Sequence, residues 1–188
     1  YYNRLREVGA AGEFGDKAPV GLGQIELDKK NYKGALELFD EAITKYAGSS
    51  SILPATQGKG QCLIELGDSK NLDSAEKIFK TIFATKEWGG EAKPHALYHL
   101  GLIEERRKEW GKAIAWYQRI ILAHQKYKPW LAKAYLHCAQ AFINDGKNDD
   151  AKLVLRQMLE RKDREGRNDL DDQPEFKQAQ ALLAKIGS

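Results

Sequence analysis

The sequence is poor in the residue types that build disulfide frameworks and metal centres. Its 188 residues contain only two cysteines and four histidines, too few for a small disulfide-stapled fold. Cys62 and Cys138 stand far apart, within apolar helical patterns. We expect both to be buried free thiols, because free cysteine is among the most buried residue types; a disulfide is the less favoured alternative.

Long apolar runs and blocks of one charge are also missing from the sequence. No stretch approaches the roughly 18 apolar residues needed to cross a bilayer, so direct membrane insertion is not expected. The 30 basic and 27 acidic residues give a net charge of +3 and are interleaved along the chain. A nucleic-acid-binding domain usually concentrates its basic residues in a stripe, and we therefore expect no nucleic-acid partner.

Residues that could perform catalysis or hold a cofactor form no usable group. No serine or cysteine nucleophile accompanies an identifiable base, and the glycines around Gly23 and Gly60 lack the preceding strand of a phosphate-binding loop. The acidic string 169–172 lacks the turn glycine and the closing glutamate of a calcium loop. We predict no catalytic residue, no metal site and no cofactor, and hence a protein that is not an enzyme.

One histidine pair has an alternative interpretation. His95 and His99 are four residues apart, which places both imidazoles on one face of a helix, as in a metal-binding helix. A zinc site needs a third and usually a fourth ligand, and nothing in the sequence brings His124 or His137 near the pair. We interpret His95 and His99 as polar residues on a helix surface.

The few prolines are regularly placed. Each of the five stands just ahead of an apolar stretch with helical period: Pro19, Pro54, Pro94, Pro129 and Pro174. Proline fits the first turn of a helix, because its missing N–H would have no intrahelical partner there. The prolines therefore mark the first helix of four successive helix pairs, and a fifth such helix near the C-terminus.

Small residues recur once in each helix of the pairs that the prolines mark. One series falls in the first helix of each pair, at intervals of 37, 41 and 38 residues: Gly23, Gly60, Gly101 and Ala139. The other falls in the second helix, at intervals of 40, 38 and 38 residues: Ala35, Ala75, Ala113 and Ala151. Helices about 8–10 Å apart need small side chains where they cross. This spacing predicts a stack of helix hairpins.

Turn residues divide each repeat in two. In the first repeat we expect one helix over about 19–29 and a second after Asn31, whose side chain suits an N-cap. In the second repeat Gly67 suits the C-cap of a helix that begins near Pro54, and residues 68–71 are expected to lengthen the following turn. The prediction is an all-α chain of antiparallel helix pairs.

The repeat motifs resemble the tetratricopeptide repeat. The resemblance is carried by four of them: Leu22-Gly23, Ala35-x3-Phe39, Leu100-Gly101 and Ala113-x3-Tyr117. It extends over four repeats, from about Pro19 to Arg161, with a period longer than the usual ~34 residues of the family. The resemblance implies a right-handed α-solenoid that serves as a non-enzymatic interaction module.

The joins between repeats resemble a narrower group. The segment 45–68 and the residues before Pro129 are similar to repeats of bacterial cell-envelope proteins. These are the periplasmic partner of the Tol–Pal system and the lipoprotein component of the outer-membrane assembly machine. The resemblance implies a periplasmic or cell-envelope location, with the cytoplasm as the alternative. Because the chain begins at Tyr1 and not at Met, we expect it to be a piece of a longer protein.

We expect a single repeat domain over residues 1–188. Residues 1–15 are predicted to hold part of a preceding helix and a linker, residues 16–160 the four helix pairs, and residues 174–186 a C-terminal capping helix.

The resemblance also predicts a binding surface. In the family the first helices line the concave face, and the exposed positions are counted from the small residue of each repeat. These positions give the predicted peptide-binding residues: Gln24, Gln57, Gln61, Tyr98, Leu102, Leu136, Gln140 and Asn144. Carboxamides both donate and accept hydrogen bonds, which suits a peptide backbone, while Tyr98 and Leu136 are expected to be apolar anchors. The alternative is that the glutamines are solvated or pair with one another.

We therefore predict a protein that binds a peptide segment or a partner helix on its concave face. The alternative is self-assembly into a homo-oligomer through residues 1–8 or through the apolar residues of the last helix: Phe176, Leu182, Leu183 and Ile186. Trp116 is a further candidate, either for a partner contact or for packing against the next repeat.

Overall fold

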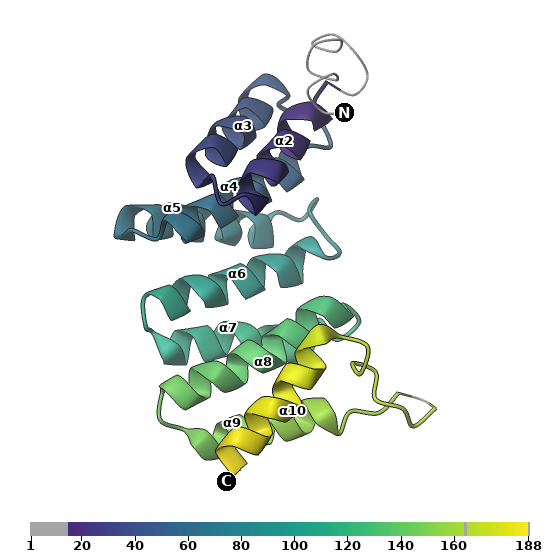
Figure 1. Cartoon of the computed structure of the whole chain (residues 1–188). Helices are drawn as coiled ribbons and strands as arrows, with labels where there is room; N and C mark the ends of the chain where they lie inside the picture. The colour runs from purple at the N-terminus through teal and green to yellow at the C-terminus, as the bar shows by residue number, and fades with distance from the viewer. Residues whose placement is uncertain (1–14, 164, 188) are drawn as a thin grey trace. The chain divides into compact units, whose positions relative to one another are not determined.

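The structure, a computed structural model, describes residues 15–163 and 165–187 (Figure 1). Every regular element within these residues is an α-helix, which confirms the predicted all-α helical repeat. The chain divides into two compact units, Tyr1–Trp88 and Gly89–Ser188. A single domain over residues 1–188 stays a prediction. The partial helix predicted before residue 15 lies outside the described residues.

The first unit contains two helix pairs. Helix α2 (Lys17–Asp28) pairs with α3 (Tyr32–Lys45), and α4 (Ile52–Leu66) pairs with α5 (Ser69–Ala84). Helix α3 packs against both α2 and α4, and α2 also contacts α4. The first helices of the two pairs therefore lie next to each other, which is the arrangement that a stack of hairpins requires.

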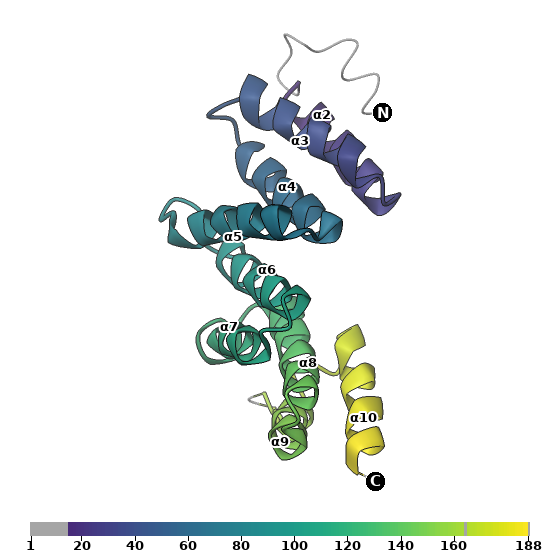
Figure 2. The same ribbon diagram turned by 90° about the vertical axis from the view of Figure 1, so that its left-hand side faces the viewer.

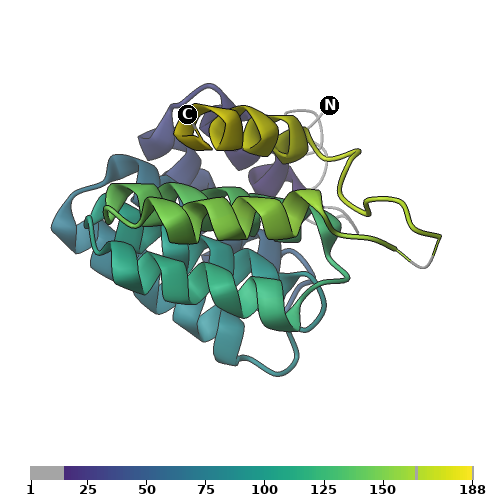
Figure 3. The same ribbon diagram turned by 90° about the horizontal axis from the view of Figure 1, so that it is seen from below.

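The second unit holds two more pairs and a final helix. Its helices are α6 (Ala92–Arg106), α7 (Trp110–Ala123), α8 (Lys128–Asn144), α9 (Asn148–Leu159) and α10 (Pro174–Gly187). Helix α7 packs against α6 and α8, and α6 also contacts α8. Helix α10 packs against α9 and α8 (Figures 2 and 3). It thus repeats the contacts of a first helix, as the position of Pro174 predicts.

Local signals in the sequence set three helix ends in the first unit. Asn31 caps α3, where its side chain accepts a hydrogen bond of 3.3 Å from the N–H of Gly34. Gly67 ends α4 with a φ of 74°, a left-handed conformation that favours glycine. The prediction for residues 68–71 was wrong. Asp68 is the N-cap of α5 and accepts a hydrogen bond from the N–H of Asn71 at 2.9 Å, so residues 69–71 form the first helical turn.

The small residues of the first helices are packing devices, as their spacing predicts. A Cβ atom at Gly23 would lie 2.8 Å from Cε1 of Phe39, and one at Gly60 would lie 2.6 Å from Cζ of Phe79. Both aromatic rings come from the second helix of the same pair and are buried. Glycine is therefore needed at these crossings for space.

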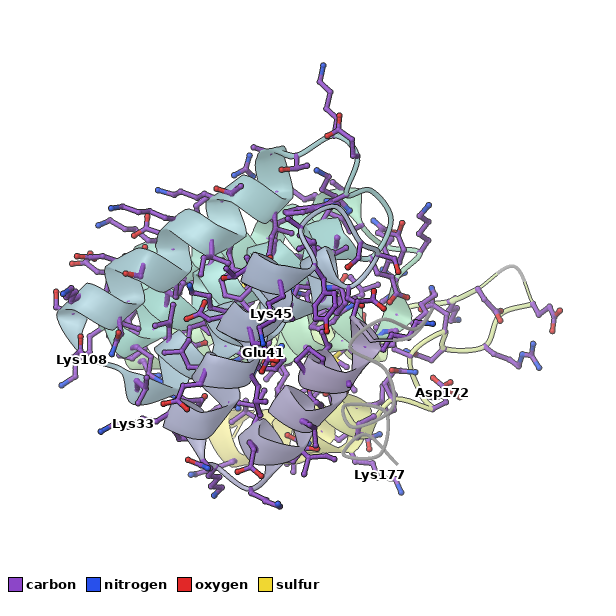
Figure 4. The ribbon with its side chains drawn as sticks, turned by 90° about the horizontal axis from the view of Figure 1, so that it is seen from above. Lys33, Glu41, Lys45, Lys108, Asp172 and Lys177 are labelled. Atoms are coloured by element: carbon purple, nitrogen blue, oxygen red, sulfur yellow. The ribbon has the colours of Figure 1, made fainter. Side chains whose placement is uncertain are left out.

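The interior contains both cysteines, and most charged residues lie outside; Glu104 and Glu175 are buried exceptions. Cys62 and Cys138 are buried and free, as predicted, and burial raises the pKa of the Cys62 thiol to about 11. On the exposed side of α3, Lys45 Nζ lies 3.0 Å from Oε1 of Glu41 (Figure 4). Across residues 15–163 and 165–187, none of the helices combines the length and the apolar character that a membrane span requires.

Candidate functional site

In the first unit, the predicted binding residues lie on α2 and α4. Gln24 is exposed on α2, whereas Gln57 and Gln61 are half-buried on α4. The carboxamide Nε2 of Gln24 donates a hydrogen bond of 2.9 Å to Oδ1 of Asp28, one turn further along α2. Because α2 contacts α4, the three glutamines belong to adjacent first helices.

In the second unit, α8 has one accessible stripe. Five residues of this helix are half-buried or exposed at steps of three and four, the spacing of one helical face: Trp130, Lys133, His137, Gln140 and Asn144. The residues between them are largely buried in the core. The stripe includes two predicted site residues, Gln140 and Asn144, and three that the sequence analysis did not select.

Helix α6 has a matching stripe of half-buried residues, Tyr98, Leu102 and Glu105. The ring centroids of Tyr98 and Trp130 are 5.7 Å apart, and Nδ1 of His137 lies 3.1 Å from Oε1 of Glu105. We call these two stripes together the α6–α8 face. The structure therefore brings four of the candidate residues, Tyr98, Leu102, Gln140 and Asn144, onto one surface, and adds an aromatic and charged part to it.

A hydrogen-bonded chain of side chains fixes this face. The hydroxyl of Tyr117 on α7 donates to Oε1 of Glu105 at 2.9 Å. A carboxylate only accepts hydrogen bonds, so Nδ1 of His137 donates to Glu105. In neutral His137, Nε2 then accepts a hydrogen bond from the hydroxyl of Tyr98 at 3.0 Å. Burial, followed by the charge of Glu105, raises the pKa of both tyrosines, which keeps both hydroxyls protonated.

Leu136 does not belong to the accessible stripe. Its side chain is only 4% exposed, so the structure corrects the prediction of an apolar anchor at this position. The physical reason is the direction of the side chain, because Leu136 is one residue from His137 and therefore faces about 100° away from it around the helix. Tyr98, at the equivalent position of α6, reaches the face because its ring is longer.

Two buried histidines lie beneath the aromatic part of the face. His95 and His99 are 7% and 6% exposed, so the expectation of two surface residues was wrong. Nδ1 of His99 donates to the backbone carbonyl of His95 at 2.8 Å, and the rings of His95 and Trp130 pack edge to face with their centroids 4.9 Å apart. Burial lowers the pKa of His99 to about 4 and that of His95 to about 2, so both are neutral at pH 7.

Lys133 lies over the aromatic pair of the face. Its Nζ is 4.8 Å from the ring centroid of Trp130 and 5.9 Å from that of Tyr98. An ammonium group above an aromatic face is attracted by the ring quadrupole, which holds the lysine in place. The face therefore offers a cation with a defined position beside two partly accessible rings.

The other candidates have structural partners. Arg119 lies 4.9 Å over the ring of half-buried Trp116. Asp169, from the acidic string, accepts a hydrogen bond of 2.8 Å from Nε of Arg161 and another from Lys128, so it is an anchor for the loop that follows α9. Within the described ranges, no three histidine, cysteine, aspartate or glutamate side chains are grouped as metal ligands would be.

The sequence contained a signal for the residues that were missed. Trp130, Lys133 and His137 share the helical spacing of Gln140, so projecting residues 128–144 onto a helix would have selected them. The pairing of His137 with Glu105 had no such signal, because it joins residues 32 positions apart on two different helices.

Comparison with known families identifies the repeat. A family model described as tetratricopeptide repeat matches residues 2–50 and 63–127, which is more than half of the chain. Comparison with curated proteins found no match.

Proposed function

Because the chain belongs to the tetratricopeptide repeat family, we propose that it binds a peptide segment or a partner helix on the accessible face of its first helices. Tetratricopeptide repeats generally mediate protein–protein interactions and are typically non-enzymatic. A preformed surface of this kind works by presenting fixed side chains to a partner.

The observation that carries the proposal is the construction of the α6–α8 face. Its aromatic pair, Tyr98 and Trp130, is only partly covered, and aromatic residues are enriched among the residues that dominate binding energy at interfaces. Polar side chains extend along α8 beside this pair. The hydrogen bonds from Tyr98 to His137 and from His137 to Glu105 hold the face in one conformation, which reduces the entropy lost on binding.

Site-specific photo-crosslinking tests the proposal with matched positions. A photoreactive residue replaces Gln57 of α4 or Gln140 of α8, both on first helices. The controls replace Gln118 of α7 or Gln157 of α9, which are exposed glutamines on second helices. We expect discrete protein adducts from the first-helix positions alone. Equal adducts from all four positions, or adducts from the controls only, would contradict the proposal.

Self-assembly through α10 is a second candidate, and one observation favours it. Helix α10 packs against α8 and α9, yet four apolar residues along it stay half-buried: Phe176, Leu182, Leu183 and Ile186. Light scattering over a range of concentrations tests this candidate. A monomer at all concentrations excludes it, whereas a dimer that Leu183→Glu dissociates supports it. Residues 1–8, the other predicted contact, lie outside the described residues.

We also propose a location in the bacterial cell envelope, which rests on the resemblance of the joins between repeats alone. Fractionation of cells that produce the full gene product tests this location. Recovery in the cytoplasmic fraction would contradict it.

A further inference from the structure

The accessible stripe of α8 presents hydrogen-bond donors. The side chains of Trp130, Lys133 and Gln140 each carry at least one N–H group, and none of these side chains forms a hydrogen bond with another residue in the part of the chain that the structure describes. One carboxylate oxygen of this face, Oε1 of Glu105, already accepts hydrogen bonds from Tyr117 and His137. Because the side chains of Trp130 and Lys133 can only donate, a complementary ligand must bring acceptors for them.

Helical and extended ligands differ in the number of backbone carbonyls that are free to accept hydrogen bonds. In a helical ligand the backbone carbonyls are occupied by hydrogen bonds within the helix, except in its last turn. An extended ligand has a carbonyl at every residue that can accept a hydrogen bond. The donors on α8 therefore match an extended backbone better than the side of a helix.

The spacing of the donors along α8 indicates which extended conformation of the ligand fits best. Lys133 and Gln140 are seven residues apart on α8, which is about 10.5 Å at about 1.5 Å per residue. In a polyproline II segment, equivalent carbonyls recur every three residues, or about 9 Å. In a β-strand they recur every two residues, about 6.7 Å apart, and those three residues apart point in opposite directions. The donor spacing is closest to one turn of polyproline II.

The aromatic pair supplies the second half of such a site. The rings of Tyr98 and Trp130, 5.7 Å apart and tilted by 51°, offer two adjoining partly accessible apolar surfaces. Proline-rich segments dock into grooves lined by aromatic rings, and they bind at low entropic cost because the polyproline II helix is preformed. Proline also has a carbonyl and no N–H, which suits a surface that offers donors.

We propose that the α6–α8 face binds a proline-containing segment in the polyproline II conformation. Its prolines pack on Tyr98 and Trp130, and its backbone carbonyls accept hydrogen bonds from Lys133 and Gln140. This inference rests on the proposed function, since it identifies the kind of partner for the same face.

Fluorescence anisotropy with three labelled synthetic peptides tests the inference. The first peptide is proline-rich and spans about four turns of polyproline II, at about three residues per turn. The others, of equal length, are an amphipathic helix and an alternating valine–threonine strand. The proline-rich peptide is expected to bind most tightly. Lys133→Met and Gln140→Met should each weaken its binding about three- to tenfold, because each substitution removes one hydrogen bond to the peptide.

The control is Lys112→Met on α7, which removes an exposed lysine from a second helix and should leave the affinity unchanged. Preference for the helical or the strand peptide, binding that is insensitive to both α8 substitutions, or no binding of the proline-rich peptide would overturn the inference. Continued crosslinking from position 140 would then show that the proposed function stands without it. Loss of crosslinking as well would contradict both the inference and the proposed function.

Discussion

The ring of Tyr117 occupies the space that a side chain at Gly101 would need. A Cβ atom built on Gly101 would lie 2.3 Å from Cε1 and 2.5 Å from Cζ of this ring. Tyr117 is fully buried, and its hydroxyl is held by Glu105, so the ring is not free to move away. The crossing of α6 and α7 is therefore set by the pairing of one glycine with one tyrosine.

Gly101→Ala should destabilise the chain. Overpacking at a fixed ring costs about 1–3 kcal/mol or more, which exceeds the gain of up to about 1 kcal/mol in helix propensity. Gly111→Ala on α7 is the matched control, because nothing lies within 4 Å of a Cβ there. Denaturant unfolding measures both. Equal free energies of unfolding for the two variants would refute the packing role of Gly101.

The fourth repeat shows which second substitution should reduce the loss of stability caused by Gly101→Ala. There Ala139 stands at the glycine position and Leu155 at the aromatic position, a smaller side chain opposite a larger one. In a Tyr117→Leu background, Gly101→Ala should therefore cost less than it does in the parent chain. A double-mutant cycle on the free energy of unfolding measures the coupling, and strict additivity would contradict this explanation.

Tyr117→Phe should destabilise the second unit by about 1–3 kcal/mol, since a hydrogen bond to a carboxylate is lost. The same packing remains, so the effect isolates the hydroxyl that donates to Glu105. Tyr32→Phe is the control, because the Tyr32 hydroxyl makes no hydrogen bond with any residue of the described ranges. Comparable losses in free energy of unfolding for the two variants would show that the Glu105 contact contributes nothing.

Much of the fold could be predicted because its signals are local. All five prolines lie within the first three residues of a helix, and the glycine series marks the helix crossings. The site was less predictable, since its chemistry depends on contacts between helices. Nothing local shows that His95 and His99 are buried, that Leu136 faces the core, or that His137 meets Glu105.

Asp169→Asn should lower stability at neutral pH. Hydrogen bonds from Arg161, then from Lys128, lower the pKa of Asp169 to about 2, below the usual value of about 3.9 in unfolded chains. The ionised form is therefore favoured by folding, and its contribution, about 1–2 kcal/mol, is present above pH 4 and is lost as the pH falls toward 2. The parent and variant unfolding curves should converge near pH 2. A constant difference across this range would contradict the assignment.

His99 should make the chain less stable in mild acid. Its folded-state pKa is lowered to about 4 by burial, whereas an unfolded histidine has a pKa of about 6.5. Below pH 6.5 the unfolded state binds a proton that the folded state does not, so the free energy of unfolding falls until about pH 4, by up to about 3 kcal/mol. His99→Asn keeps a donor for the carbonyl of His95 but does not titrate. Unfolding measured between pH 7 and 4 should therefore show a shallower dependence for His99→Asn, and identical slopes for the two chains would show that His99 is protonated as readily in the folded state as in the unfolded one.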